Sequence, residues 1–255
     1  IVVLLVIVGG GWWYVSNNPI PAGPTAEEHA LVGTVQENRD YKYSESTDIY
    51  EIEAYWPDQV PLGSAAAGAK ARLTIEKDLK ERIDEFKVNG RFDTLNVEDR
   101  AIQGLDGTRK YALSMEYQDY DAPGYHSYIY AIYEDTLGAH PNGYFMTLVF
   151  DTEGNVVLLG DVLATNPNWL EELSLEVSQS VVAQLKERLG DSLPQGDEGP
   201  DVTGAMYPEG VAAKEENFQN WVIDGETLVI AIPPYQVAAY AAGSFEVRVP
   251  LAGLQ

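Results

Sequence analysis

The segment "YHSYIYAIYEDTLGAHPNGYFMTLVF" (residues 125–150) decides the fold that the sequence predicts. It holds two runs rich in aromatic and aliphatic residues, 125–133 and 144–150, and both have the composition of β-strands. Residues 136–144 between them contain Pro141, Asn142 and Gly143 in succession, which favour a turn. The segment therefore predicts two strands joined by a loop that contains His140.

Further strands and two amphipathic helices are predicted on either side of this pair. Strand patterns cover residues 48–57, 111–117, 227–232 and 244–249. Apolar residues at three- and four-residue spacing predict long helices over 68–88 and 167–189, the second with Asn166 as its N-cap and Pro167 at its first position. Because the strands come in runs with few helices between them, we expect an α+β fold of antiparallel sheets covered by two long helices, in two similar-sized units.

The overall charge of the chain limits its partners. Among 255 residues, 40 are Asp or Glu and 16 are Lys or Arg, so the formal net charge is −24. Such a charge repels phosphate backbones and anionic headgroups, and we expect no nucleic-acid partner but a preference for a basic one. The chain has no cysteine, which excludes disulfides, thiolate metal sites and a cysteine nucleophile.

The N-terminal segment "IVVLLVIVGGGWWYV" (residues 1–15) is apolar and uncharged and ends in aromatic residues. This pattern is typical of a transmembrane helix with an interfacial aromatic belt, although a full span needs roughly 20 residues. We therefore expect a truncated, uncleaved single-pass anchor; a signal peptide and a buried core helix are the alternatives. Proline-rich residues 16–40 are a predicted linker. Glu27 and Glu28 follow the anchor, and this favours an extracytoplasmic position for the C-terminal part.

Known catalytic motifs are absent from the sequence, and we predict no catalytic residue, no metal site and no cofactor. His126 and His140 bracket a strand, which at ~3.3 Å per extended residue places them about 25 Å apart, too far for a shared metal. Antiparallel pairing would instead bring Asp119, Asp121, His126 and Asp151 to one edge of the sheet. A Ca²⁺ or Zn²⁺ site there is one interpretation of these residues, and ordinary turn-forming aspartates are the other.

The order of several motifs resembles a known family. These motifs are "TLGAHPNGYFMTLVFD" (136–151), "GDVL" (160–163), a long helix, and "EENFQNWVIDGETLVIAIPPYQVAAYAAGSFEVRVPLAGL" (215–254). Over residues 121–255 they resemble the RsiV-like extracellular domain family, whose function is unknown in general. Residues 41–120 resemble its companion domain, which also occurs in the peptidoglycan deacetylase PdaC. The most specific matches are Gly138, Ala139, His140 and Pro141 in the loop, and Tyr235, Tyr240 and Gly243 in the C-terminal stretch.

One departure from the family pattern concerns the loop. The family usually has glycine at the position of Leu137, and a leucine there argues against a backbone with positive φ. The candidate partner-binding or loop-signature residues are His140, Pro141, Asn142 and Tyr144. Three interpretations of His140 remain open: it orders the loop, it contacts a partner at the surface, or it takes part in catalysis or metal binding.

The resemblance implies a membrane-anchored, extracytoplasmic binding or sensor ectodomain without catalytic activity. In RsiV this ectodomain binds lysozyme, so the partner that the resemblance implies is a basic protein such as a lysozyme, or a cell-wall component such as peptidoglycan. The acidic charge of this chain would complement a basic protein. The alternatives are a cell-wall enzyme or enzyme accessory module, and a structural envelope protein.

Overall fold

The computed structural model describes residues 41–105, 109–196 and 199–254. The predicted membrane anchor at residues 1–15 and the predicted linker at 16–40 lie outside these ranges. Among the helices inside them, none combines the length and the apolar character needed to cross a membrane.

The first layer of β-structure is a five-stranded sheet. Its strands lie in chain order across the sheet: β1 (Tyr41–Ser46), β2 (Tyr50–Trp56), β3 (Tyr111–Ala122), β4 (Tyr125–Asp135) and β5 (Asn142–Asp151). The β2–β3 pair is parallel, and the other three pairs are antiparallel. A parallel pair needs a long crossover, and α2 (Ala65–Gly90), η1 (Phe92–Thr94) and α3 (Val97–Ile102) supply it. The sequence did not predict this parallel pair, because strand patterns do not reveal the direction of pairing.

Helix α2 covers one face of this sheet. It begins after Ser64, whose hydroxyl accepts a hydrogen bond from the Ala67 amide at 3.1 Å, and it ends where Arg91 adopts a left-handed conformation with φ 48°. Its buried residues recur every three or four positions and pack against the sheet residues whose side chains point to the same side. On the sheet, these are the alternate residues that include Met115, Tyr130 and Phe150.

A three-stranded antiparallel sheet forms the second β-layer. It contains β8 (Trp221–Asp224), β9 (Thr227–Ile232) and β10 (Phe245–Pro250), with β9 in the centre. Helix α5 (Trp169–Leu189) packs on it through Leu173, Val177, Val181 and Leu185, which recur every four residues, as expected for the predicted amphipathic helix. The helix begins two residues later than expected, and Asn166 is not its N-cap: the Asn166 side chain accepts instead from the Asn168 amide at 2.9 Å.

The remaining elements are short connections around α5 and the second sheet. They are α4 (Leu159–Val162), η2 (Gly190–Ser192), β6 (Gln195–Gly196), β7 (Gly199–Pro200), η3 (Pro208–Val211), η4 (Glu215–Phe218), η5 (Tyr240–Ala242) and η6 (Leu251–Gly253).

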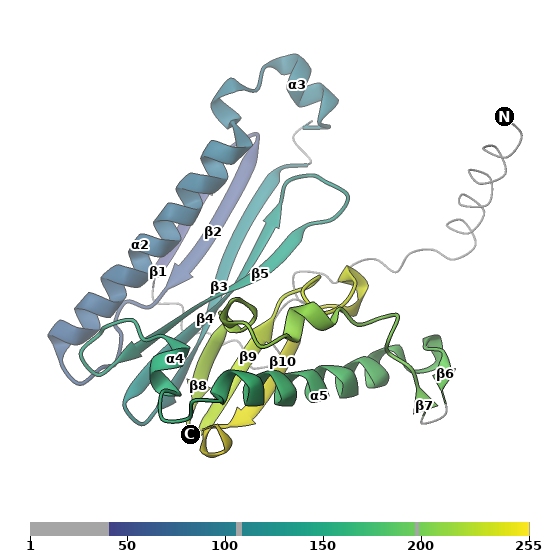
Figure 1. Cartoon of the computed structure of the whole chain (residues 1–255). Helices are drawn as coiled ribbons and strands as arrows, with labels where there is room; N and C mark the ends of the chain where they lie inside the picture. The colour runs from purple at the N-terminus through teal and green to yellow at the C-terminus, as the bar shows by residue number, and fades with distance from the viewer. Residues whose placement is uncertain (1–40, 106–108, 197–198, 255) are drawn as a thin grey trace, which may run out of the picture.

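The two sheets pack face to face, so the described chain has four layers: α2, the five-stranded sheet, the three-stranded sheet and α5 (Figure 1). Ile129 and Phe145 of the first sheet meet Val222, Val229 and Ala231 of the second between the layers. Strands β4, β5, β8 and β9 are therefore apolar on both faces, which explains their nearly continuous hydrophobic sequences.

The structure supports the mixed α+β class with antiparallel sheets and few helices, and it corrects several boundaries. The sequence predicted strands at 111–117 and 125–133, whereas β3 continues to Ala122, so that only Pro123 and Gly124 separate it from β4. β5 begins at Asn142, inside the Pro-Asn-Gly segment that favoured a turn. The predicted division between residues 120 and 121 falls within β3, and strands from both sides of it pair in one sheet.

Candidate functional site

The loop that joins β4 to β5 (residues 136–141) has a positive φ at Leu137, which the sequence did not lead us to expect for a leucine. Leu137 has φ 60°, in the left-handed region. The expectation that leucine would disfavour positive φ was therefore wrong for this loop. The Asp135 carboxylate accepts a hydrogen bond from the Leu137 amide at 2.7 Å, and this contact holds the start of the turn. Gly138 and Ala139 follow at the exposed tip.

The side chain of His140, which lies in this loop, contacts two tyrosines from the C-terminal part of the chain. The His140 ring stacks on Tyr240, with 4.1 Å between ring centroids and 20° between planes. Tyr235 lies 5.4 Å from Tyr240 and 5.7 Å from His140, centroid to centroid. We call His140, Tyr235 and Tyr240 the aromatic cluster. Its three members, which the family resemblance had singled out, lie up to 100 residues apart in the sequence and come together only in the fold.

The hydrogen bonds of the aromatic cluster indicate which tautomer the neutral His140 ring adopts. Its Nδ1 lies 2.9 Å from the Pro141 carbonyl oxygen, and its Nε2 lies 2.7 Å from the Tyr235 hydroxyl. Because a carbonyl can only accept, Nδ1 carries a proton, and in the neutral ring Nε2 accepts from Tyr235. The Tyr240 hydroxyl also donates to the Pro141 carbonyl, at 3.2 Å. Both ring nitrogens are thus engaged, and the cluster ties the loop to the 233–243 segment.

Exposure differs across the aromatic cluster. Tyr240 is buried, with 9% of its surface exposed, whereas Tyr235 is 52% exposed. Tyr235 also has φ 71°, a conformation that is uncommon for a residue with a side chain. The backbone around Gly243 (φ 74°) is held by Arg188, which donates to the carbonyls of Ala242 at 2.8 Å and Ser244 at 2.6 Å. The cluster therefore presents one tyrosine ring to solvent on a fixed base.

Two other predicted contact residues lie on β5 rather than in the cluster. Asn142 is exposed and sits opposite Glu134, at the start of the strand. Tyr144 is partly buried on the face that α2 covers, and Arg82 of α2 lies over its ring at 5.7 Å. Burial raises the pKa of Tyr144.

At the opposite end of β4, three of the four residues of the predicted cation site come together. Asp121 lies opposite His126 in the strand register, and its Oδ1 is 2.5 Å from His126 Nδ1. His126 Nε2 lies 3.0 Å from the Tyr128 hydroxyl and 3.5 Å from Asp119 Oδ2. Asp151 does not join them, because its carboxylate accepts from the Asn155 side chain and from backbone amides of the following turn. Within the described ranges, no group of three or more such side chains could hold a metal ion.

The His126 group is electrostatically coupled. His126 is 1% exposed, and burial alone would lower its pKa. Hydrogen bonds to Asp119 and Asp121 outweigh that effect and raise the pKa above its ordinary value. The hydrogen bond from His126 correspondingly lowers the pKa of Asp119. This arrangement places a buried imidazole against one partly buried and one exposed carboxylate at the end of a hairpin, so that protonation of His126 would form an ion pair there.

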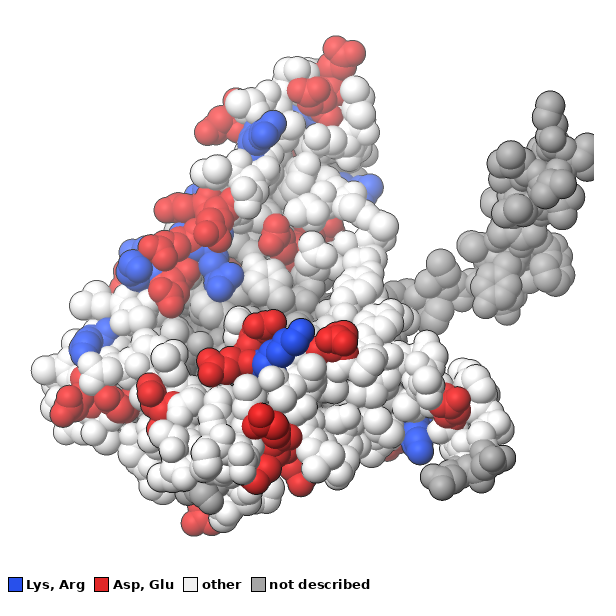
Figure 2. Space-filling view, in the orientation of Figure 1, with Lys and Arg blue, Asp and Glu red and all other residues white. Residues whose placement is uncertain are grey.

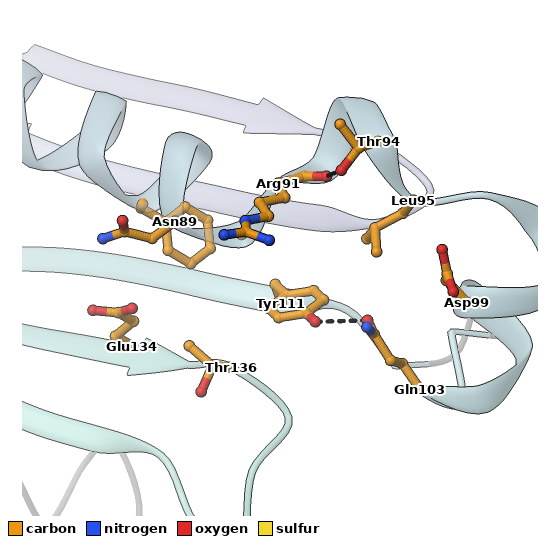
Figure 3. Close-up of a pocket in the computed structure, with 11 residues that line it drawn as sticks. Asn89, Arg91, Thr94, Leu95, Asp99, Gln103, Tyr111, Glu134 and Thr136 are labelled. Atoms are coloured by element: carbon orange, nitrogen blue, oxygen red, sulfur yellow. Dashed lines mark hydrogen bonds between the residues drawn. The ribbon is translucent and has the colours of Figure 1, made fainter.

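A cavity of ≈ 490 Å³ lies at the other end of the five-stranded sheet, where α2 ends and β3 begins (Figure 3). In Figure 3 Asn89 and Arg91 lie at the end of α2, Glu134 and Thr136 lie at the end of β4, and the Tyr111 hydroxyl donates a hydrogen bond of 2.7 Å to Gln103. The sequence did not point to this cavity. Its residues come from five separate elements (α2, η1, α3, β3 and β4) and the turns beside them, form no motif and meet only because α2 crosses over the sheet.

Comparison with known proteins finds a family match for one segment of the chain. Residues 161–252 match a family described as "Protein of unknown function (DUF3298)". A solved structure of a DUF3298 family member from Bacteroides fragilis superposes with a TM-score of 0.53 and 15% identity, covering 83% of this chain and 89% of that one. A DUF3298 family protein from Pseudomonas aeruginosa has a TM-score of 0.48 and 14% identity, covering 84% and 91%. No curated protein matches the chain. The chain thus carries a DUF3298 domain at residues 161–252 and shares its overall fold with a solved member of that family.

Proposed function

We propose that this protein is a non-catalytic binding module of the cell envelope and that the aromatic cluster is its contact surface for a basic protein such as a lysozyme. The convergence of His140, Tyr235 and Tyr240 carries the proposal. Tyrosine is among the residues most often responsible for binding energy at protein interfaces, because a rigid ring supplies contact area at little entropic cost. The Tyr235 ring is half exposed and is already held by stacking and hydrogen bonds. Binding of a partner would therefore cost little side-chain conformational entropy.

The charge of the chain supports a basic partner. The formal net charge is −24, and Figure 2 shows acidic side chains spread over the face in view. Several basic side chains of α2 are paired with acids on the same helix, including Arg72 and Lys80, which both contact Glu76. The remaining acidic excess would attract a basic protein and accelerate its association.

The chemistry of the cluster supports binding rather than catalysis. Both nitrogens of His140 are occupied by fixed partners, and the only side chain that it touches through a hydrogen bond in the described structure is a tyrosine. A general base must instead reach a proton on the substrate or nucleophile. As part of this proposal, we infer that the chain is related to the RsiV-like and PdaC-type domains. We also infer that it has an extracytoplasmic location and a membrane anchor at residues 1–15.

The proposal is tested by binding of the 255-residue chain to a C-type lysozyme, measured by biolayer interferometry at low and high salt. We expect binding that weakens as salt rises, and a loss of at least about 10-fold in affinity for Tyr235→Gly. Glycine suits the positive φ at this position, so the ring is removed without strain. Leu73→Ala, which trims an exposed apolar side chain on α2, is the matched control and should bind as the unaltered chain does.

Two outcomes would overturn the proposal. Failure to retain lysozyme would remove the basic protein as partner, and retention on insoluble peptidoglycan in the same assay would replace it with a glycan. Hydrolysis or deacetylation of peptidoglycan by the purified chain, abolished by His140→Ala, would replace the binding function with a catalytic one.

A further inference from the structure

The cavity at the end of α2 shares no residue with the aromatic cluster, and its lining indicates a ligand of its own. We propose that it binds a neutral, hydroxyl-rich small molecule of saccharide size. The volume of ≈ 490 Å³ lies within the range of about 300–1,000 Å³ that small-molecule sites occupy.

The polar groups of the lining suit a ligand with many hydroxyls. Asn89 and Gln103 each carry an amide that both donates and accepts, Arg91 offers several donors in one plane, and Glu134 and Asp99 offer acceptors. Figure 3 shows these side chains arranged around the cavity from different sides. A hydroxyl needs a donor and an acceptor at the same time, and neighbouring hydroxyls on a ring match planar, two-pronged groups of this kind.

The charge of the lining is nearly balanced. The lining contains one guanidinium, that of Arg91, and two carboxylates, those of Asp99 and Glu134. Burial raises the pKa of Glu134, so the site disfavours further negative charge. An anionic ligand would meet two acids, and a cationic ligand would meet Arg91. The balance therefore favours a ligand without net charge.

An aromatic wall complements this polar lining. The Tyr111 ring packs edge-on against Phe92, with 5.0 Å between centroids, and Phe92 in turn contacts Phe86 at 5.3 Å. The Tyr111 hydroxyl donates to Gln103 at 2.7 Å, which holds the ring in place. A fixed aromatic ring offers an apolar face for the C–H groups of a sugar ring, while the polar side chains bind its edge.

Two neutral disaccharides, cellobiose and di-N-acetylchitobiose, are suitable probes. The free amino acid alanine, a smaller zwitterion, serves as the negative control. Binding to the 255-residue chain is measured by saturation-transfer NMR and isothermal titration calorimetry. We expect at least one disaccharide to bind and alanine not to bind. Arg91→Gly and Glu134→Gln should each raise its Kd at least about 10-fold, whereas Glu51→Gln, an exposed residue of β2 outside the cavity, should leave it unchanged.

Folding of the variants can be separated from binding. Arg91 has φ 48°, which glycine adopts freely, so Arg91→Gly should melt no lower than the unaltered chain. The proposal is wrong if neither disaccharide binds, if the cavity variants bind like Glu51→Gln, or if alanine binds and the disaccharides do not. Because the cavity and the aromatic cluster share no residue, lysozyme binding can fail while saccharide binding succeeds, and the reverse.

Discussion

At the scale of single residues, uncommon backbone conformations coincide with the candidate sites. Within the described ranges, three residues other than glycine have positive φ: Arg91, Leu137 and Tyr235. Arg91 lines the cavity, Leu137 lies in the β4–β5 loop beside His140, and Tyr235 is the exposed ring of the aromatic cluster. Such conformations cost roughly 1–3 kcal/mol each and persist where surrounding contacts impose them. Their positions fit the assignment of both regions as functional.

Leu137 provides a direct test of backbone strain. Leu137→Gly relieves the positive φ, whereas Leu137→Val adds a β-branched side chain to it. We expect the valine variant to have a free energy of unfolding about 1–2 kcal/mol lower than the glycine variant, measured by urea denaturation. Equal stabilities would mean that the loop relaxes to a negative φ. In that case Leu137→Val should also shift the NMR signals of His140, which lies three residues away.

At the scale of elements, β3 and β4 form a hairpin that buries a histidine at its turn end. His126 and Asp121 are paired in register, and Asp119 lies two residues away on the same side of β3. The pairing forces these side chains together even though burial alone would disfavour a charged imidazole.

This pairing predicts a pH-dependent stability. The pKa of His126 is higher in the folded chain than its ordinary value of 6.5, so protonation favours folding. The stabilisation is fully present below pH 6.5 and is lost as the pH rises through the folded pKa. Asp121→Asn, which removes one of the two carboxylates, should lower the pKa of His126 and reduce this loss of stability as the pH rises above 6.5. The measurements are the melting temperature and the NMR titration of the imidazole, in a chain with only 3 histidines.

Asp151→Asn is the matched control for that titration. Its carboxylate serves the turn that follows β5 and has no hydrogen bond to His126 in the described structure. It should therefore leave the pKa of His126 in place. A shift of equal size in both variants would mean that the effect comes from overall charge rather than from the hairpin contact.

At the scale of the whole molecule, two helix-covered sheets share an apolar interface. Phe145, at 8% exposure, packs from the first sheet toward Val222 and Val229 of the second. Each sheet also has a core of its own beneath its helix. The interface therefore decides whether the four layers unfold together.

We expect the layers to unfold as one unit. Phe145→Ala should lower the free energy of unfolding by about 3–5 kcal/mol, because it removes a large side chain from between the sheets. Hydrogen exchange measured by mass spectrometry should then show a similar loss of protection in β3–β5 and in β8–β10. Val97→Ala, at an 83% exposed position on α3, should change neither sheet. Loss of protection in one sheet alone would indicate two independent units.

Much of the secondary structure follows from local patterns. Both long helices, and the strands at 48–57, 125–133, 227–232 and 244–249, correspond to elements of the structure, because period and composition act over a few residues. The amphipathic character of α5 was also predicted correctly. Strands β1 and β8 were missed. β1 is polar and short, and β8 has only four residues.

The candidate sites, like the secondary structure, were predicted only in part from the sequence. The family resemblance named His140, Tyr235 and Tyr240, but only the fold stacks them. The local sequence could suggest that Asp119, Asp121 and His126 meet, since a hairpin joins them, but Asp151 is held elsewhere by its own turn. No sequence pattern predicted the cavity, because Arg91, Gln103 and Glu134 come from separate parts of the chain.

The sequence by itself determined the α+β class, the two long helices, most strands, the acidic charge and the turn chemistry around His140, since each depends on composition or on neighbours along the chain. Only the tertiary structure decided the parallel β2–β3 pair, the packing of the two sheets, the aromatic cluster and the cavity. These depend on contacts between residues far apart in the chain, which are selected by the simultaneous burial of many apolar faces rather than by any local pattern.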